Sequence, residues 1–207
     1  MNKNLQKYMS EFYRSINARM PDDRGSSSFV QTQTLRDDML KLFEQYNIKS
    51  IFDAGCNDCV WAHSLAQYID YQGGDISPSL IAEAWHWYPD LAVDIFDITT
   101  DPIPLVDCVV MRDVAIHLIT ADKKLAIENW LSSGVPWILM THSEDIRVNE
   151  SGVYSVNLHE SLINWCVAPW NFPEPRAKIV EVGNGVTSNK PGRRLALWHR
   201  DEIVNLL

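Results

Sequence analysis

Apolar residues follow two different spacings along this chain, and the two spacings alternate. Short apolar runs typical of strands are followed by segments in which apolar residues recur at helical spacing. The strand-like runs lie at residues 48–52, 69–76, 91–96, 105–111 and 134–141. The helical spacing occurs at residues 5–16, 34–46, 61–69, 77–88 and 121–132. This alternation predicts an α/β fold with a doubly wound, mainly parallel sheet and right-handed crossovers.

The pattern changes after residue 141. Residues 142–175 are rich in Asn, Trp and Pro and show no clean period, which is typical of a binding loop or cap. Residues 178–182 and 194–198 then form two strand-like runs joined by a turn that contains Gly and Pro. These runs predict a terminal antiparallel hairpin beside the parallel sheet.

An acidic residue follows each of three successive strand-like runs. The first run stops at Asp53 and Gly55, and helical spacing resumes at Trp61, so a strand, a tight turn and a helix start are expected there. Asp75 lies about 20 residues further on, where nucleotide-binding α/β folds place an acid that accepts from ribose hydroxyls. A carboxylate at Asp97 can accept from an adenine amino group. One such acid is more often a solvated strand end, but three together favour a nucleotide site.

Composition excludes some classes of function. The chain has 207 residues, 46% of them apolar, and a formal net charge of −9. That charge argues against broad contact with a nucleic-acid backbone, which needs clustered Lys and Arg. The first residues lack the apolar core of a signal peptide, and apolar residues do not run together for the roughly 18 positions of a membrane span. We therefore expect a cytoplasmic protein without a membrane segment.

Two of the four cysteines, Cys56 and Cys59, form a C-x-x-C pair within the Gly turn. Such a pair can be half of a zinc site or a redox motif. Neither a second pair nor a His-x-x-His motif follows, and Cys108 and Cys166 stand alone. We therefore interpret the pair as two thiols in a turn and predict no metal.

The Gly turn resembles the first motif of the class I S-adenosylmethionine-dependent methyltransferases, roughly Asp-x-Gly-x-Gly-x-Gly. Asn57 and Cys59 stand at the second and third glycine positions. More broadly, the chain is similar to a group of small class I methyltransferases found in bacterial gene clusters and phages, over residues 24–200. The matching segments are Gly25–Ser28, Gly55–Trp61, Gly73–Ile76, Arg112-Asp113 with His117-Leu118, Asn157-Leu158 and Ala168–Pro175.

The resemblance implies a seven-stranded Rossmann-like sheet in a single domain over residues 1–207. The expected parts are N-terminal helices and a lid loop (1–47), a cofactor-binding half (48–141), a substrate loop or cap (142–175) and the terminal hairpin and tail (176–207). It also implies S-adenosylmethionine as the cofactor and methyl transfer to a small polar acceptor, such as a sugar, nucleotide or metabolite. We expect a monomer or a homodimer.

The resemblance also implies roles for individual residues. Asp113 or His117 is expected to act as the catalytic base, and Arg112 either binds an anion or pairs with Asp113. The residues expected at the acceptor are Asn157, Trp165, Trp170 and Asn171. The residues expected at the cofactor are Gly25, Ser26, Asp53, Gly55, Cys56, Asn57, Asp58, Trp61, Asp75, Ile76, Asp97, Ile98 and Arg112.

Three alternatives remain open at this stage. A catalytically weakened binding or effector protein on the same fold, encoded by a phage or a gene cluster, is favoured by Asn57 and Cys59. A nicotinamide-dependent oxidoreductase is disfavoured by the terminal hairpin. Methylation of a nucleic-acid base normally requires an Asn/Asp-Pro-Pro-aromatic sequence after the fourth strand, and this chain has Arg-Asp-Val-Ala from residue 112 instead.

Overall fold

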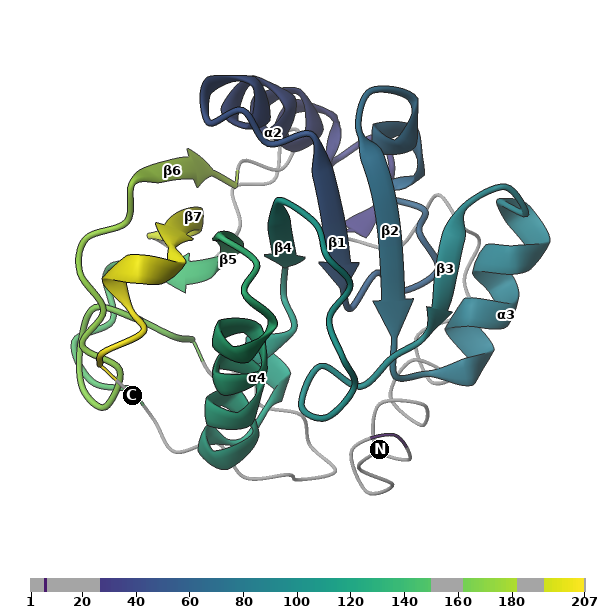
Figure 1. The fold of residues 1–207 in the computed structure, drawn as a ribbon. Coiled ribbons are helices and arrows are strands. Elements are labelled where there is room, and N and C mark those ends of the chain that lie inside the picture. Colours follow the sequence, from purple (N-terminus) through teal and green to yellow (C-terminus); the bar gives the residue numbers. More distant parts are fainter. Residues whose placement is uncertain (1–5, 7–26, 150–161, 182–191, 207) are drawn as a thin grey trace.

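The computed structural model describes residue 6 and residues 27–149, 162–181 and 192–206. Its strands are β1 (Ser50–Ala54), β2 (Asp70–Asp75), β3 (Ala92–Ile95), β4 (Cys108–Met111), β5 (Trp137–Ser143), β6 (Ala177–Val180) and β7 (Arg193–His199). Within the described residues they form one seven-stranded sheet in the order β3-β2-β1-β4-β5-β7-β6 (Figure 1). β1 to β5 run parallel, and β7 runs antiparallel to β5 and β6. The predicted sheet and its terminal antiparallel hairpin are therefore confirmed.

The helices of the described residues are α2 (Gln33–Gln45), which precedes β1, α3 (Pro78–Trp87) between β2 and β3, and α4 (Thr120–Ser133) between β4 and β5. Short 3₁₀ helices are η3 (His63–Gln67) between β1 and β2, η4 (Ala115–His117) before α4, and η5 (Arg200–Glu202) after β7. The sequence predicts a full helix over residues 61–69, but only η3 forms there. The carbonyl oxygen of Cys59 accepts from the N–H groups of both Ala62 and His63, at 3.1 and 2.8 Å, and β2 begins at Asp70. The tight turn and the early strand therefore leave no room for a longer helix.

The start of α2 has no side-chain cap. Thr32 occupies the N-cap position, but its side chain caps no backbone N–H of the helix. Its hydroxyl instead donates to the carbonyl oxygen of Ser28 at 2.8 Å. The other predicted helix, at residues 5–16, lies outside the described residues except for Gln6.

Helices cover both faces of the sheet. Alternate residues of each strand point to opposite sides, so each face has its own set of buried strand residues. On one face, α4 packs against one set of strand residues through Ile127 and Trp130. On the other face, α2 and α3 pack against the intervening set through Met39, Phe43 and Ile81. The strand residues facing α4 include Phe52, Val109, Ile138 and Trp198, and those facing α2 and α3 include Ile51, Val110, Leu139 and Leu197. Packing on both faces holds the strands in place, and it therefore also fixes the position of the sheet edge at which the parallel strands end.

The segment after β5 contributes to the α4 face of the core. The indole N–H of Trp165 donates to the carbonyl oxygen of Thr141 at 2.9 Å. Trp165 also packs against Trp170 and Phe172, with ring centroids 5.0 and 5.5 Å apart. These aromatic side chains therefore hold the segment against the sheet.

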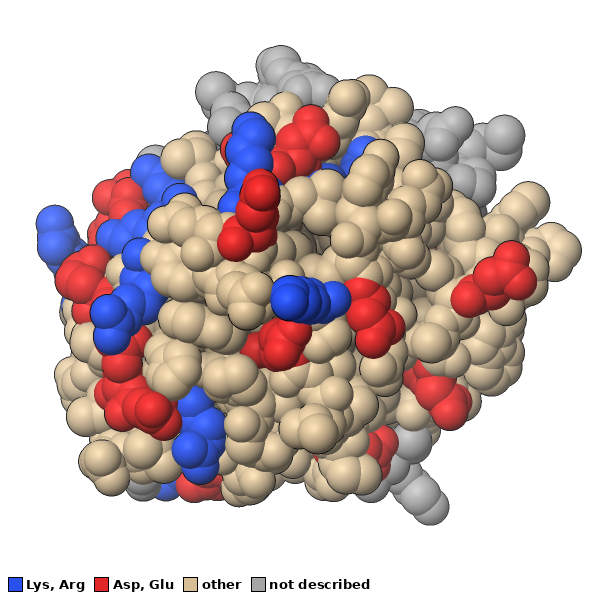
Figure 2. Space-filling model, turned by 45° about the horizontal axis from the view of Figure 1, so that its top comes forward, with Lys and Arg blue, Asp and Glu red and all other residues tan. Residues whose placement is uncertain are grey.

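None of the helices in the described residues is long and apolar enough to span a membrane. On the face shown in Figure 2, the described Lys and Arg side chains lie among Asp and Glu side chains and form no continuous basic surface.

Candidate functional site

The turn after β1 is built on Gly55, whose φ of 91° lies in the region that favours glycine. The backbone N–H groups of Gly55 and Cys56 donate to the carbonyl oxygen of Gly74 on β2, at 2.7 and 3.1 Å. A Cβ at Gly55 would collide with the side chain of Val114, which follows β4. The turn therefore requires glycine here, and it lies where the ends of β1, β2 and β4 meet.

Asn57 and Cys59, the residues at the two other glycine positions of the motif, both have left-handed backbones, with φ of 57° and 62°. Asn tolerates this conformation because its short polar side chain bonds locally. Here the Asn57 Oδ1 accepts from the N–H of Asp58 at 2.8 Å. Cys59 is fully buried, and its N–H donates to the carbonyl oxygen of Cys56 at 3.1 Å. The turn therefore has, at Asn57 and Cys59, the left-handed backbone that favours glycine, although neither residue is a glycine.

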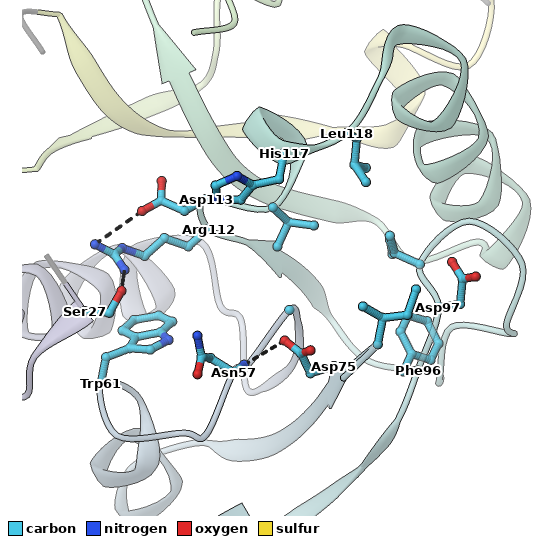
Figure 3. Close-up of a pocket in the computed structure, with 14 residues that line it drawn as sticks. Ser27, Asn57, Trp61, Asp75, Phe96, Asp97, Arg112, Asp113, His117 and Leu118 are labelled. Carbon is cyan, nitrogen blue, oxygen red and sulfur yellow. Dashed lines mark hydrogen bonds and ion pairs between the residues drawn. The ribbon is translucent and has the colours of Figure 1, made fainter. Parts of the chain in front are cut away.

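A cavity lies at this edge of the sheet, and the space within it is about 700 Å³ when the open solvent at its mouth is included (Figure 3). Asp97 and Phe96 lie at one end, and Trp61, Ser27 and Arg112 lie at the other (Figure 3). The lining residues are Ser27, Gly55, Asn57, Trp61, Asp75, Ile76, Phe96, Asp97, Ile98, Arg112, Asp113, Val114, His117 and Leu118.

Asp75 is fixed at the cavity wall by the backbone around it. Its Oδ2 accepts from the N–H of Asn57 at 3.0 Å, and its Oδ1 accepts from the N–H of Ser77 at 2.9 Å. Desolvation by burial raises the pKa of Asp75 to about 6, and the two backbone hydrogen bonds limit the rise. At neutral pH the carboxylate is therefore mostly ionised, and each oxygen retains capacity to accept a further hydrogen bond.

Asp97 follows β3 and is fully buried. Its Oδ1 accepts from the N–H and the hydroxyl of Thr99, at 3.0 and 2.6 Å. Its sequence neighbours Phe96 and Ile98 also line the cavity. An acceptor together with apolar side chains in one cavity suits a planar heterocycle that carries a hydrogen-bond donor.

Asp53 was expected to close β1 and reach the cofactor, but it lies within β1, where it pairs in register with Gly73, and it does not line the cavity. Its Oδ2 accepts from the hydroxyl of Tyr71 at 2.9 Å, whereas its buried Oδ1 has no hydrogen-bond partner among the described residues. Desolvation raises the pKa of Asp53 to about 7, although the Tyr71 hydrogen bond and the charge of Arg112 oppose the rise. The structure therefore separates Asp53 from the two other strand-end acids.

The substitution Asp53→Asn is expected to make stability less dependent on pH. The pKa of Asp53 is about 7 in the folded protein and about 3.9 in an unfolded chain, so the folded state binds the proton more tightly. The stability that the protonated Asp53 contributes is complete below about pH 4 and is lost as the pH rises through about 7. Asn still accepts from Tyr71 but does not titrate. Urea unfolding should show that, between pH 5 and pH 8, the free energy of unfolding of the wild type falls by at least about 1 kcal/mol more than that of the variant. An equal fall in both proteins would contradict a raised pKa of the buried Asp53 carboxyl.

Four charged side chains form a closed ring beside the cavity, which we call the hairpin ring: Arg112, Glu181, Arg193 and Asp113. Glu181 accepts from the Nε of Arg112 at 2.7 Å and from the Nε of Arg193 at 2.5 Å. Asp113 pairs with Arg112 at 3.7 Å and also with Arg193. The four side chains are between 5% and 18% exposed. The ring therefore connects the terminal hairpin to the end of β4.

Asp113 is held by β5 as well as by the ring. Its backbone N–H donates to the hydroxyl of Thr141 at 2.8 Å, and that hydroxyl lies 3.0 Å from the Asp113 Oδ1. Burial would raise the pKa of Asp113, but the charges of Arg112 and Arg193 outweigh burial and lower it. Asp113 is therefore a carboxylate with little tendency to take up a proton.

Several predicted site residues lie away from the cavity. Cys56 and Asp58 are buried in the turn without lining it. Trp165 and Trp170 are buried in the core, and Asn171 is exposed. Gly25, Ser26 and Asn157 lie outside the described residues.

The predicted thiol pair shows no metal geometry. Cys56 and Cys59 are free and buried, and the pKa of Cys56 is raised by a hydrogen bond with Cys59 and by burial. Among the described residues, no group of three or more His, Cys, Asp or Glu side chains could hold a metal ion.

The sequence did not indicate several residues of the site. Phe96, Val114 and Leu118 adjoin predicted residues, so their positions after strands could have signalled them. Glu181 and Arg193 gave no such signal, because Glu181 lies 69 residues from Arg112 and Arg193 lies 12 residues beyond Glu181. The pairing of β7 with β5 and of β6 with β7 brings them to the site.

No protein-family model matches the sequence, and no curated protein matches it. Solved structures match the fold. Magnesium protoporphyrin IX methyltransferase from Synechocystis PCC 6803, with bound SAM, has a TM-score of 0.63 at 16% identity, covering 96% of each chain. The N-methyltransferase NodS from Bradyrhizobium japonicum WM9, in complex with S-adenosyl-L-homocysteine, has a TM-score of 0.54 at 17% identity, covering 67% of this chain and 74% of that chain. The methyltransferase SibL in its apo form has a TM-score of 0.56 at 17% identity, covering 80% of this chain and 54% of that chain. The chain thus has the fold of S-adenosylmethionine-dependent methyltransferases.

Proposed function

We propose that this protein transfers the methyl group of S-adenosylmethionine to a small polar acceptor, such as a sugar, a nucleotide or a metabolite. The observation that carries the proposal is the cavity at the carboxyl edge of β1, β2 and β4, with ionised Asp75 fixed in its wall by the left-handed turn. Ligands bind at this edge in open α/β sheets. The antiparallel β7 favours a methyltransferase over a nicotinamide-dependent oxidoreductase, whose sheet usually ends with a further parallel strand.

The chemistry of the cavity fits each part of the cofactor. Asp75 retains acceptor capacity for ribose hydroxyls. Asp97, together with Phe96 and Ile98, suits an adenine ring with its donor amino group. The opposite end carries the charged Arg112, which suits the charged amino-acid end of the same molecule.

When bound, S-adenosylmethionine supplies an electrophilic methyl group, so the protein has to align the acceptor and accept its proton. His117 suits the second task, because it lies at the cavity wall beside Asp113 and a neutral imidazole can accept a proton (Figure 3). Asp113 is a poor base, since Arg112 and Arg193 lower its pKa. We therefore assign proton acceptance to His117 and stabilisation of the resulting imidazolium to Asp113.

The variant His117→Asn is expected to lower methyl transfer by about 10²- to 10⁴-fold, the usual contribution of a general base. Its affinity for S-adenosylhomocysteine should remain that of the wild type, because the role proposed for His117 is towards the acceptor and not towards the cofactor. Release of S-adenosylhomocysteine, measured with a panel of sugars, nucleotides and small metabolites, checks the first part, and calorimetry checks the second. Undiminished release with the same acceptor would assign His117 a structural role.

The alternative of a catalytically weakened effector depends on Asn57 and Cys59. Cys59 does not line the cavity, so its side chain does not obstruct a ligand. Asn57 keeps the backbone that lets its N–H hold Asp75. These observations support a working cofactor site and favour the enzyme.

Isothermal titration of the full chain with S-adenosylmethionine and S-adenosylhomocysteine tests the proposed function. Both should bind, and NADH should not. Absence of binding by either at millimolar concentration would remove the proposal, and binding of NADH alone would favour the oxidoreductase.

A further inference from the structure

One buried hydroxyl group holds Asp113 at both its backbone and its side chain. The hydroxyl of Thr141 on β5 accepts from the backbone N–H of Asp113 at 2.8 Å and donates to the Asp113 Oδ1 at 3.0 Å. The ion pairs with Arg112 and Arg193, in contrast, act on the carboxylate alone. Thr141 therefore fixes the direction of the chain at Asp113 and the direction of its carboxylate with a single group.

The backbone of Asp113 has a conformation that needs such a contact. Its φ of 60° lies in the left-handed region, which residues other than glycine adopt rarely and keep only where the surroundings enforce it. Asp113 lies between β4 and η4, and η4 ends at His117. The N–H of His117 donates to the carbonyl oxygen of Val114 at 3.0 Å. The conformation of Asp113 thus sets the direction in which the chain leaves β4 and reaches His117.

The carboxylate of Asp113 and the imidazole of His117 interact electrostatically at the cavity wall, where they lie beside each other (Figure 3). Burial raises the pKa of Asp113, and the charges of Arg112 and Arg193 oppose the rise. The hydrogen bond from Thr141 and the charge of His117 lower the pKa further. The interaction is mutual, so a correctly placed Asp113 carboxylate favours the protonated imidazole.

Thr141 is itself held firmly. It is 1% exposed and lies within β5, which is paired with β4 on one side and with β7 on the other. Its carbonyl oxygen accepts from the indole N–H of Trp165 at 2.9 Å. A side chain on a paired, buried strand holds its partner more precisely than one on a loop.

We propose that Thr141 is a positioning residue, which holds Asp113 so that its carboxylate stabilises the protonated imidazole of His117. The inference rests on the proposed function, in which His117 accepts the proton of the methyl acceptor. It assigns a part in proton acceptance to a side chain that does not line the cavity.

An NMR titration of the His117 imidazole tests the inference and requires no known acceptor. The variant His117→Asn identifies the His117 signal by its loss. Thr141→Val removes the hydroxyl and keeps a side chain of similar shape. The midpoint of the His117 titration should then fall by about one pH unit, the lower end of the shift that one nearby opposite charge causes. Thr141→Ser keeps the hydroxyl and should retain the wild-type midpoint.

Ser143→Ala is the matched control. Ser143 lies two residues further along β5, on the same face of the strand as Thr141, and it is also 1% exposed. Its hydroxyl has no hydrogen-bond partner among the described residues. The variant therefore loses a buried hydroxyl without losing a contact to Asp113, and the midpoint of the His117 titration should not change.

The charged groups around the pair stay the same in these variants. They are Arg112 and Arg193, Glu181, which bonds to both of them, and Asp75 and Asp97, which line the same cavity. A change in the midpoint therefore reports the placement of Asp113 and not an altered charge.

A double substitution shows whether Thr141 acts through Asp113. Asp113→Asn removes the charge and should lower the midpoint of the His117 titration by itself. Adding Thr141→Val to that variant should lower the midpoint no further, because the group that Thr141 positions has gone. If Thr141→Val does not fold, Thr141→Cys replaces the hydroxyl by a weaker donor and acceptor and should give a smaller fall in the same direction.

Three results would overturn the inference. An unchanged midpoint in Thr141→Val would mean that the hydroxyl does not place the carboxylate. An equal fall in Ser143→Ala would mean that the loss of any buried hydroxyl disturbs the site. A further fall in the double variant would mean that Thr141 acts on His117 by another route. Binding of S-adenosylhomocysteine to the wild type is measured separately, and its absence would remove the proposed function while the titration still decides whether Thr141 positions Asp113.

Discussion

The substitution Trp198→Ala should lower the free energy of unfolding by about 3–5 kcal/mol, the range for removing a buried aromatic side chain. Trp198 lies fully buried on β7, next to Phe172 and His142 with ring centroids 6.0 and 5.5 Å apart. Its indole N–H donates to the carbonyl oxygen of Pro173 at 2.8 Å. The substitution therefore opens a cavity in the α4 face of the core and removes one tie to the segment after β5.

Urea unfolding measures the loss, and Trp87→Ala is the control. Trp87 is 56% exposed at the end of α3, so its removal should change the free energy of unfolding by no more than about 0.5 kcal/mol. Equal effects of the two substitutions would show that β7 does not close the core as described.

The substitution Asp75→Ala should weaken S-adenosylhomocysteine binding by about 1.5–3 kcal/mol, the scale for hydrogen bonds to a charged group. The carboxylate is expected to accept from the ribose hydroxyls, and it also fixes the turn through the N–H of Asn57. Both contributions disappear with the side chain. Calorimetry of the folded variant measures the change in the dissociation constant.

Asp70→Ala is the control for this prediction. Asp70 begins the same strand, β2, and is exposed at the opposite edge of the sheet. Its removal alters the net charge by the same amount as Asp75→Ala but should leave the affinity unchanged. An unchanged dissociation constant in Asp75→Ala would place the ribose elsewhere.

Much of the fold could be predicted because strand and helix periods differ strongly in this sequence. β4 is buried along its whole length and was visible as the apolar run 105–111, although the strand itself is shorter, Cys108–Met111. The helix expected at 61–69 failed for a local reason, since the turn at Cys59 uses the first residues and β2 follows at once. Periodicity indicates which residues face a core, but it does not report how many residues a turn consumes.

The site residues that could be predicted are those that directly follow or end a parallel strand. Asp75, Asp97 and Asn57 lie at the cavity because parallel strands end at one edge. Asp53 has the same sequence context, yet it stays inside β1, where its side chain points to Tyr71 rather than to the cavity. Successive side chains of a strand point to opposite faces, so the position of an acid within its strand decides whether it reaches the cavity, and sequence patterns do not resolve strand ends that finely.

Residues 142–175, which are rich in Trp, show a second limit of prediction from sequence. Trp165 and Trp170 were expected at an acceptor, and both are buried in the core. An aromatic side chain serves packing and ligand stacking equally well, so residue type alone does not separate the two. Glu181 and Arg193 were not predicted, because a salt bridge between distant segments leaves no local pattern.

A structure of the full chain soaked with S-adenosylhomocysteine tests the central claim most directly. We expect the ribose hydroxyls on the Asp75 carboxylate, the adenine between Phe96 and Ile98, and the amino-acid end beside Arg112 and Trp61. A nucleoside bound elsewhere, or bound with its amino-acid end beside Asp97, would contradict the account.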